Sequence, residues 1–100
     1  MDMKISGKHM DVTDAIREYI ERKAGRLPRY FDRIQEIVVI LEQHDRKFEV
    51  EILLHIEHHD PIIAKHTQED LYACVDQSVD KAERQLTDLK ERLRNRKHNV

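Results

Sequence analysis

The sequence predicts an α+β domain in which two helices pack on one face of a four-stranded sheet, in the order β-α-β-β-β-α. Three observations carry this prediction. Residues 48–58 alternate between apolar and polar side chains, and residues 37–41 form an aliphatic, mostly β-branched run. Two further segments, 14–27 and 70–95, repeat apolar residues every three or four positions. A period of two is typical of a half-buried strand, whereas a period near 3.6 is typical of an amphipathic helix.

The first strand and the first helix fall within the first third of the chain. Residues 3–6 read as a short strand that ends near Gly7. Thr13 is a suitable helix N-cap, and Asp14 adds a favourable negative charge in the first turn. Pro28 would remove a helical hydrogen bond, so the helix is expected to end or kink just before it. The apolar positions of this helix are Ile16, Tyr19, Ile20, Ala24 and Leu27.

The middle of the chain predicts three strands. Residues 37–41 are expected to form a central strand, and the polar residues 43–46 suit a hairpin turn. Across residues 48–58 the apolar side chains share one face and the glutamates share the other, with Leu53 the exception. The sheet is therefore expected to have one buried face and one wet, acidic face. A turn at 58–61 leads to a short fourth strand over 62–67.

A long second helix is predicted from Asp70 to about Asn95, because no glycine or proline interrupts its apolar stripe. Such a helix spans about 39 Å at 1.5 Å per residue, which exceeds the length of the strands it would cover. Its basic end is therefore expected to project past the sheet. The stripe consists of Leu71, Val75, Val79, Ala82, Leu86, Leu89 and Leu93.

The composition is typical of one soluble, globular domain over residues 1–100, with a basic helical tail over about 90–100. Hydrophobic residues make up 39% and charged residues 38% of the 100 residues. No apolar run approaches the roughly 18 residues of a membrane span, and the N-terminus does not resemble a signal peptide. We therefore expect a cytoplasmic monomer with no membrane partner. The single cysteine, Cys74, excludes an internal disulfide and is expected to pack in the core.

The net charge of −2 is unevenly distributed. Residues 13–33 hold six cations and four anions, residues 34–67 three cations and seven anions, and residues 84–97 six cations and two anions. A molecule with one basic and one acidic side suits steering toward a phosphate-rich partner in one orientation. Charge runs on helices are also common as solvated faces, so composition alone leaves both readings open.

Metal binding and catalysis have little support in the sequence. His55, Glu57 and His59 alternate along a strand, with His58 and His66 nearby, a spacing that would also suit zinc. No HExxH or paired-cysteine pattern accompanies them, and two glycines cannot build a phosphate loop. We expect no metal, no cofactor and no enzymatic activity. The aromatic residues are expected to pack in the core and at its edges: Tyr19, Tyr30, Phe31, Phe48 and Tyr72.

Several short motifs together resemble the ribosome hibernation promoting factor and ribosome-associated inhibitor family, from about residue 3 to residue 95. The resemblance implies a fold similar to double-stranded RNA-binding domains, which agrees with the element order read above. Glu83 and Asp88 depart from the family pattern by placing acids on a helix that is usually more basic. The motifs are Ile-Ser-Gly-Lys at 5–8, Val-Thr-Asp-Ala-Ile-Arg-Glu-Tyr at 12–19, Tyr-Phe-Asp-Arg-Ile at 30–34, Asp-Leu-Tyr-Ala at 70–73, Asp76, Asp-Lys at 80–81 and Arg-Gln-Leu at 84–86.

The resemblance implies binding to the small ribosomal subunit and its ribosomal RNA in the mRNA and tRNA decoding channel, where occupancy inhibits translation during stress or stationary phase. It also implies a short form with no C-terminal dimerisation domain, which would need a separate ribosome-dimerising factor to pair ribosomes. The alternatives are a general RNA-binding or protein-interaction module of the same fold and, with least support, a small metal-dependent enzyme. The implied RNA-binding residues are Lys23, Arg26, Lys81, Arg84, Lys90, Arg92 and Arg94, with Arg22, Arg29 and Lys97 as weaker candidates.

Overall fold

The computed structural model describes the backbone of residues 2–98 and the side chains of residues 2–95. The predicted order β-α-β-β-β-α is confirmed, with a short 3-10 helix, η1, added after the first helix. The elements are β1 (Asp2–Lys8), α1 (Asp14–Ala24), η1 (Leu27–Arg29), β2 (Ile34–His44), β3 (Lys47–Ile56), β4 (Ile62–Gln68) and α2 (Leu71–His98).

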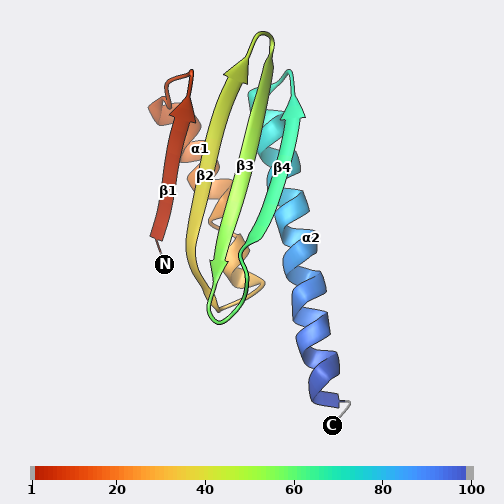
Figure 1. Ribbon diagram of the computed structural model, residues 1–100. Coiled ribbons are helices and arrows are strands. Elements are labelled where there is room, and N and C mark those ends of the chain that lie inside the picture. Colours follow the sequence, from red (N-terminus) through yellow and green to blue (C-terminus); the bar gives the residue numbers. More distant parts are fainter. Residues whose placement is uncertain (1, 99–100) are drawn as a thin grey trace.

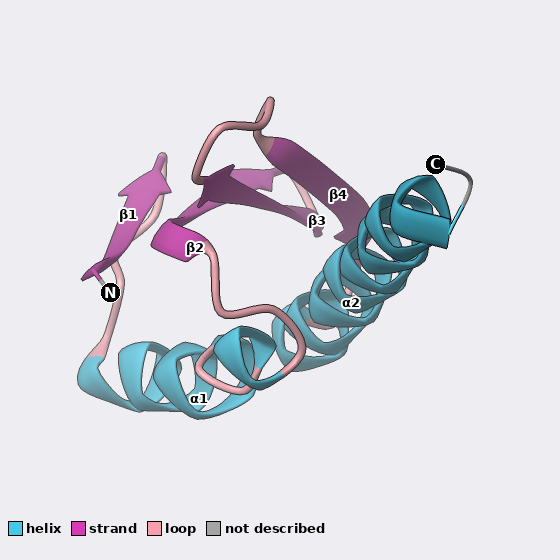
Figure 2. Ribbon diagram, turned by 90° about the horizontal axis from the view of Figure 1, so that it is seen from below, coloured by secondary structure: helices cyan, strands magenta, loops and turns pink. Residues whose placement is uncertain are grey.

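The four strands form one sheet in the order β1-β2-β3-β4, and both helices cover the same face of it (Figures 1 and 2). β1 pairs in parallel with β2, so the chain crosses over between them through α1. β2, β3 and β4 pair antiparallel through tight connections. α1 lies beneath the β1–β2 half of the sheet and α2 beneath the β3–β4 half (Figure 2). The fold therefore has two layers, with the core between them.

The local sequence signals set the ends of the first helix. The Thr13 hydroxyl accepts a hydrogen bond from the Ile16 amide at 3.2 Å, which confirms Thr13 as the N-cap. α1 ends at Ala24 with Gly25 as its C-cap, and Pro28 then starts the single turn of η1. The prediction that the helix stops before Pro28 is confirmed, and η1 redirects the chain toward β2.

We expect Thr13→Ala to lower the free energy of unfolding by about 1 kcal/mol, because the amides of the first helical turn lose their side-chain acceptor. Urea denaturation measures this loss. Gln77→Ala is the matched control, since Gln77 is exposed within α2 and caps nothing. Equal stability of Thr13→Ala and the wild type would show that α1 does not depend on this cap.

The strands are longer than the apolar runs that identified them. β1 covers Asp2–Lys8 rather than residues 3–6, and β2 covers Ile34–His44 rather than residues 37–41. Because β2 is paired on both sides, polar residues such as Glu36 and Glu42 are held in the ladder by backbone hydrogen bonds. The predicted hairpin is confirmed as a turn at residues 45–46, where Asp45 adopts the left-handed φ of 54°.

The alternation of β3 and the apolar stripe of α2 meet in the core, as predicted. Leu54 on β3, Leu41 on β2 and Leu86 on α2 are fully buried. Cys74 is also fully buried, with its thiol 3.1 Å from the carbonyl oxygen of His66, and burial raises the pKa of that thiol. The one buried polar side chain among the described residues is Ser78, whose hydroxyl lies 2.9 Å and 3.1 Å from two backbone carbonyl oxygens. The core is therefore apolar and its polar groups are paired.

The second helix extends past the sheet, as its length predicts (Figure 1). It has 28 residues and is about 42 Å long at 1.5 Å per residue. The turns that project beyond the sheet carry Lys90, Arg92 and Arg94. The fold thus presents a cationic helix end beside η1 and the loop that follows it. No helix among residues 2–98 combines the length and apolar character needed to cross a membrane.

Candidate nucleic-acid interface

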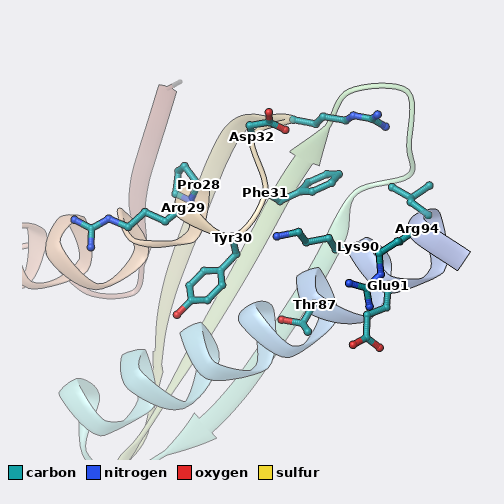
Figure 3. Close-up of a pocket in the computed structure, with 11 residues that line it drawn as sticks. Pro28, Arg29, Tyr30, Phe31, Asp32, Thr87, Lys90, Glu91 and Arg94 are labelled. Carbon is teal, nitrogen blue, oxygen red and sulfur yellow. The ribbon is translucent and has the colours of Figure 1, made fainter. Parts of the chain in front are cut away.

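A groove with a volume of about 870 Å³ lies between the segment at 28–33 and the last turns of α2 (Figure 3). After α1 ends at Ala24, η1 and the loop that follows it carry the chain across α2 before β2 begins. The groove lies outside the core, and its volume falls in the range of ordinary ligand sites. Its lining holds four cations, Arg29, Arg33, Lys90 and Arg94, against two acids, Asp32 and Glu91.

Aromatic and aliphatic side chains line the inner part of this groove. Phe31 is buried and anchors the loop in the core, while the Arg33 guanidinium lies 5.9 Å from the centre of its ring. Leu93 faces the groove from α2 and is partly buried. The Lys90 side chain projects between Tyr30 and Phe31 (Figure 3). The groove therefore combines an apolar floor with a cationic rim, and with only two acids its charge is net positive.

The aromatic residues only partly follow the predicted packing. Phe31 is buried, and Tyr19 and Phe48 pack against the core as expected. Tyr30 and Tyr72 expose 40% and 43% of their surface, so the prediction of a packed position is wrong for Tyr30. Tyr72 packs edge-on against the Tyr19 ring with centroids 4.8 Å apart. Tyr30 instead borders the groove, where interaction with the Glu83 carboxylate raises the pKa of its hydroxyl.

A smaller groove of about 250 Å³ lies between α1 and α2 and carries mixed charge. Lys23 and Arg26 line one side of it, and acids of α2 line the other. The Lys23 ammonium lies 3.8 Å from a carboxylate oxygen of Asp76. Two of the predicted RNA-binding cations therefore face acids of the same chain, which lowers the net positive charge that they present to a ligand.

Tyr19 joins the two helices beside this smaller groove. Its hydroxyl donates a hydrogen bond of 2.7 Å to Asp76, and the Arg22 guanidinium lies 5.3 Å from the centre of its ring. The hydrogen bond to Asp76 and burial raise the pKa of Tyr19 to about 12. This hydrogen bond joins α1 to α2, and both helices carry basic residues. It therefore helps to fix the positions of these residues relative to one another.

We expect Asp76→Asn to lower the pKa of Tyr19 from about 12 toward its ordinary value near 10, because the neighbouring negative charge is removed. A raised tyrosine pKa means that the folded state favours the neutral hydroxyl. The contribution of Tyr19 to the free energy of unfolding is therefore fully present below pH 10 and is lost as the pH rises from 10 to about 12. Ultraviolet absorbance during an alkaline titration measures the shift, and Tyr19→Phe identifies the affected residue. An unchanged titration in Asp76→Asn would contradict this assignment.

The remaining predicted cations do not border a single groove. The Lys81 ammonium donates a hydrogen bond of 3.0 Å to the Lys65 carbonyl oxygen of β4, beside a similar bond of 2.9 Å from Gln85 to Ile63. These bonds occupy backbone acceptors of a strand at the sheet edge, where unpaired groups invite association with other strands. Arg92 lies on the same side of α2 as Gln85. Lys81 is thus partly engaged in holding α2 against β4.

Three other candidates lie elsewhere. Arg84 is exposed and, at 100° per residue, points away from the core on the side opposite Leu86. Arg22 is exposed beside the Tyr19 ring. Lys97 belongs to the last turn of α2, and its side chain lies outside the described residues. The large groove therefore unites Arg29, Lys90 and Arg94 from the predicted set and adds Arg33, which sequence reasoning did not select.

The outer face of the sheet has the opposite character. Acids outnumber lysines on this face by five to four: Asp2, Glu36, Glu42, Glu49 and Glu51 against Lys4, Lys8, Lys47 and Lys65. The Lys65 ammonium lies 3.2 Å from Glu49 and 3.7 Å from Glu51, and these carboxylates raise the pKa of Lys65. The predicted acidic face is confirmed, so a polyanion would approach the helical face.

The histidines proposed for metal binding pair with other side chains. His55 lies 3.7 Å from Glu36, His58 lies 3.4 Å from Glu57, and His66 lies 3.2 Å from Gln68. Within the described part of the chain, one group of side chains has metal-ligand spacing, and it consists of Glu42, His44 and Glu49. Their ligand atoms lie within 4.8 Å of one another.

The chain resembles known proteins over nearly its whole length. Residues 3–94 match the model of the family described as Sigma 54 modulation protein / S30EA ribosomal protein. A ribosome hibernation promoting factor from Azotobacter vinelandii is 42% identical over 92 residues, which cover 92% of this chain and 85% of that protein.

Two solved structures share the fold. The N-terminal domain of Thermus thermophilus Protein Y superposes with a TM-score of 0.81 at 33% identity, covering 89% of this chain and 99% of that one. A ribosomal subunit interface protein from Coxiella burnetii superposes with a TM-score of 0.85 at 28% identity, covering 91% and 99% of the two chains.

Proposed function

The chain belongs to the Sigma 54 modulation protein / S30EA ribosomal protein family, and we propose that it is a ribosome hibernation factor that binds the small ribosomal subunit and inhibits translation. The names of two relatives, the hibernation promoting factor of Azotobacter and the ribosomal subunit interface protein of Coxiella, support a ribosomal partner. In this proposal the protein acts in the cytoplasm during stress or stationary phase. It acts by occupancy, with no catalytic step and no cofactor.

The observation that carries the proposal is the cationic groove on the helical face. Arg33, Lys90 and Arg94 line it, although the net charge of the chain is −2, and Arg29 lines it with its guanidinium pointing away (Figure 3). Arginine and lysine bind phosphate oxygens through charge-assisted hydrogen bonds, and each contact releases counterions from the RNA. The acidic sheet face would be repelled by RNA. Binding is therefore directed to one side of the protein.

We assign the binding surface to the helical face, centred on the large groove. Lys23 and Arg26 extend it along α1, after partial neutralisation by Asp76. Bound in the decoding channel, a rigid domain of this size would occupy the space of mRNA and of the tRNAs in the aminoacyl and peptidyl sites. The remaining cations are proposed as peripheral RNA contacts: Arg22, Lys81, Arg84, Arg92 and Lys97.

We further propose that residues 1–100 act as a single ribosome-binding domain. The two helices and the four strands share one core, so the groove and the sheet form one unit. A separate ribosome-dimerising factor is proposed as a further partner. The protein binds as a monomer in this proposal, because both walls of the groove come from one chain.

A tRNA-exclusion experiment tests the proposed function. Small subunits programmed with mRNA are incubated with labelled tRNA and increasing amounts of the protein, and retained tRNA is measured by filter binding. We expect loss of tRNA to be complete near one protein per subunit. Lys4→Glu/Lys8→Glu is the control. It reverses two charges on the sheet face, as Lys90→Glu/Arg94→Glu would in the groove, and it should exclude tRNA as the wild type does.

Two results would contradict the proposal. Retention of tRNA on subunits that demonstrably carry the protein would exclude occupancy of the decoding channel. Equal affinity for small subunits and for an isolated RNA duplex would instead favour a general RNA-binding module of the same fold.

A further inference from the structure

We propose that the large groove binds one unpaired RNA nucleotide, with its base against Phe31 and Leu93 and its flanking phosphates at Arg33, Lys90 and Arg94. This inference rests on the proposed function, because it names the part of the RNA that the groove takes. It concerns the apolar floor of the groove, which phosphate binding leaves unexplained.

The lining of the groove matches the two halves of a nucleotide. Phe31, with 8% of its surface exposed, and the partly buried Leu93 form a small apolar floor, and Tyr30 adds an aromatic ring that is 40% exposed. Lys90 reaches between the two aromatic side chains in Figure 3, at the boundary between the floor and the cationic rim. A planar base can pack on the floor while the phosphates remain at the rim. A free phosphate would leave the apolar half unused.

The shape of the groove favours an unpaired nucleotide over a duplex. At about 870 Å³ it has the size of a small-ligand site, whereas an RNA duplex presents its backbone and a shallow minor groove. Bases in single-stranded loops and bulges can leave the stack and pack on aromatic side chains. The helical face would then contact RNA in two ways, with scattered cations on phosphates and one base inserted between η1 and α2.

Thr87 provides a way to close the groove without changing a charge. It is exposed, lines the groove from α2, and donates its hydroxyl hydrogen bond to the Glu83 carbonyl oxygen at 3.0 Å. Thr87→Trp would place an indole in the space of the base. Gln77→Trp is the matched control, because Gln77 is exposed on the same helix and lines none of the grooves described above.

The test uses nuclear magnetic resonance with an unpaired RNA tetranucleotide and an abasic analogue of equal charge. We expect nuclear Overhauser effects between base protons and both the Leu93 methyl groups and the Phe31 ring. The abasic analogue should bind about 10-fold more weakly, because stacking on an aromatic side chain contributes roughly that factor per base. Thr87→Trp should lose the base contacts, and Gln77→Trp should keep them.

Binding of the same proteins to small subunits is measured in parallel, so that the two proposals can fail separately. Subunit binding without base contacts, or equal affinity for the abasic analogue, would overturn the nucleotide site and leave the proposed function intact. Base contacts without subunit binding would support the nucleotide site and refute the proposed function. An acidic peptide that produces the same Leu93 and Phe31 shifts as RNA would also overturn the assignment.

Discussion

Lys90→Glu/Arg94→Glu is expected to weaken binding to the small subunit by at least about 30-fold near 0.15 M salt. The logarithm of the binding constant falls by about 0.9 for each phosphate contact per tenfold rise in salt. Two phosphate contacts strengthen binding by about 30-fold when the salt falls from 1 M to 0.15 M, and the double mutant loses this gain. The reversed charges also repel the RNA. The magnitude of the salt slope should also fall by about 2. Co-sedimentation over a salt series measures both quantities.

The control for this experiment is Lys4→Glu/Lys8→Glu, which reverses two charges on the acidic sheet face. Lys4 and Lys8 lie in β1, on the face opposite the helices. The control should bind within about threefold of the wild type, since its changed charges lie beyond a Debye length of roughly 8 Å from the interface. Equal weakening by the two double mutants would show that net charge, rather than the groove, determines binding.

Leu86→Ala is expected to lower the free energy of unfolding by about 2–5 kcal/mol, a large share of the roughly 5–15 kcal/mol that stabilises a typical domain. Leu86 is fully buried where α2 packs on the sheet. The shortened side chain would leave a cavity between the two layers. Urea denaturation at pH 7 measures the loss.

The matched comparison is Gln77→Ala on the exposed side of the same helix, which should change the free energy of unfolding by no more than about 0.5 kcal/mol. A loss below about 1 kcal/mol for Leu86→Ala would contradict the packing described here. It would mean that α2 is loosely attached, and the groove could not then be a preformed site.

The architecture could be predicted because the spacing of apolar residues along the chain identifies the strands and helices and their buried faces. Phe48, Val50 and Ile52 alternate with glutamates because one face of β3 contacts the core and the other contacts water. The stripe of α2 is equally regular, since only that side meets the sheet. The strand ends were predicted less well. Glu42 and Gln43 belong to β2 through backbone pairing, which no side-chain pattern records.

The candidate site could be predicted only in part. A helical phase indicates which cations avoid the core, but it does not say which neighbouring element each one meets. The phase places Lys81 away from the core and Lys90 on a flank, but it does not reveal that Lys81 meets a carbonyl of β4 and Lys90 meets the loop after η1. Arg33 is one of the six cations of residues 13–33, but it was not selected as an RNA-binding residue. Its place in the Tyr-Phe-Asp-Arg-Ile run, directly after the break at Pro28, was the available signal.

The opposed charges of the two faces suggest one orientation on the ribosome. The helical face carries the cationic groove, and the outer sheet face carries five acids against four lysines. Turning the sheet toward RNA would bring a face of net negative charge near phosphates, while Lys4 and Lys65 on that face already pair with its glutamates. The orientation is therefore as much a consequence of repulsion at one face as of attraction at the other.

A cryo-electron microscopy map of the protein bound to the small subunit tests the central claim most directly. The account predicts one copy per subunit in the decoding channel, with the groove between η1 and α2 against ribosomal RNA and the acidic sheet face turned away from the nearest phosphates. A copy on the outer surface of the subunit, or one whose sheet face contacts the RNA, would contradict it.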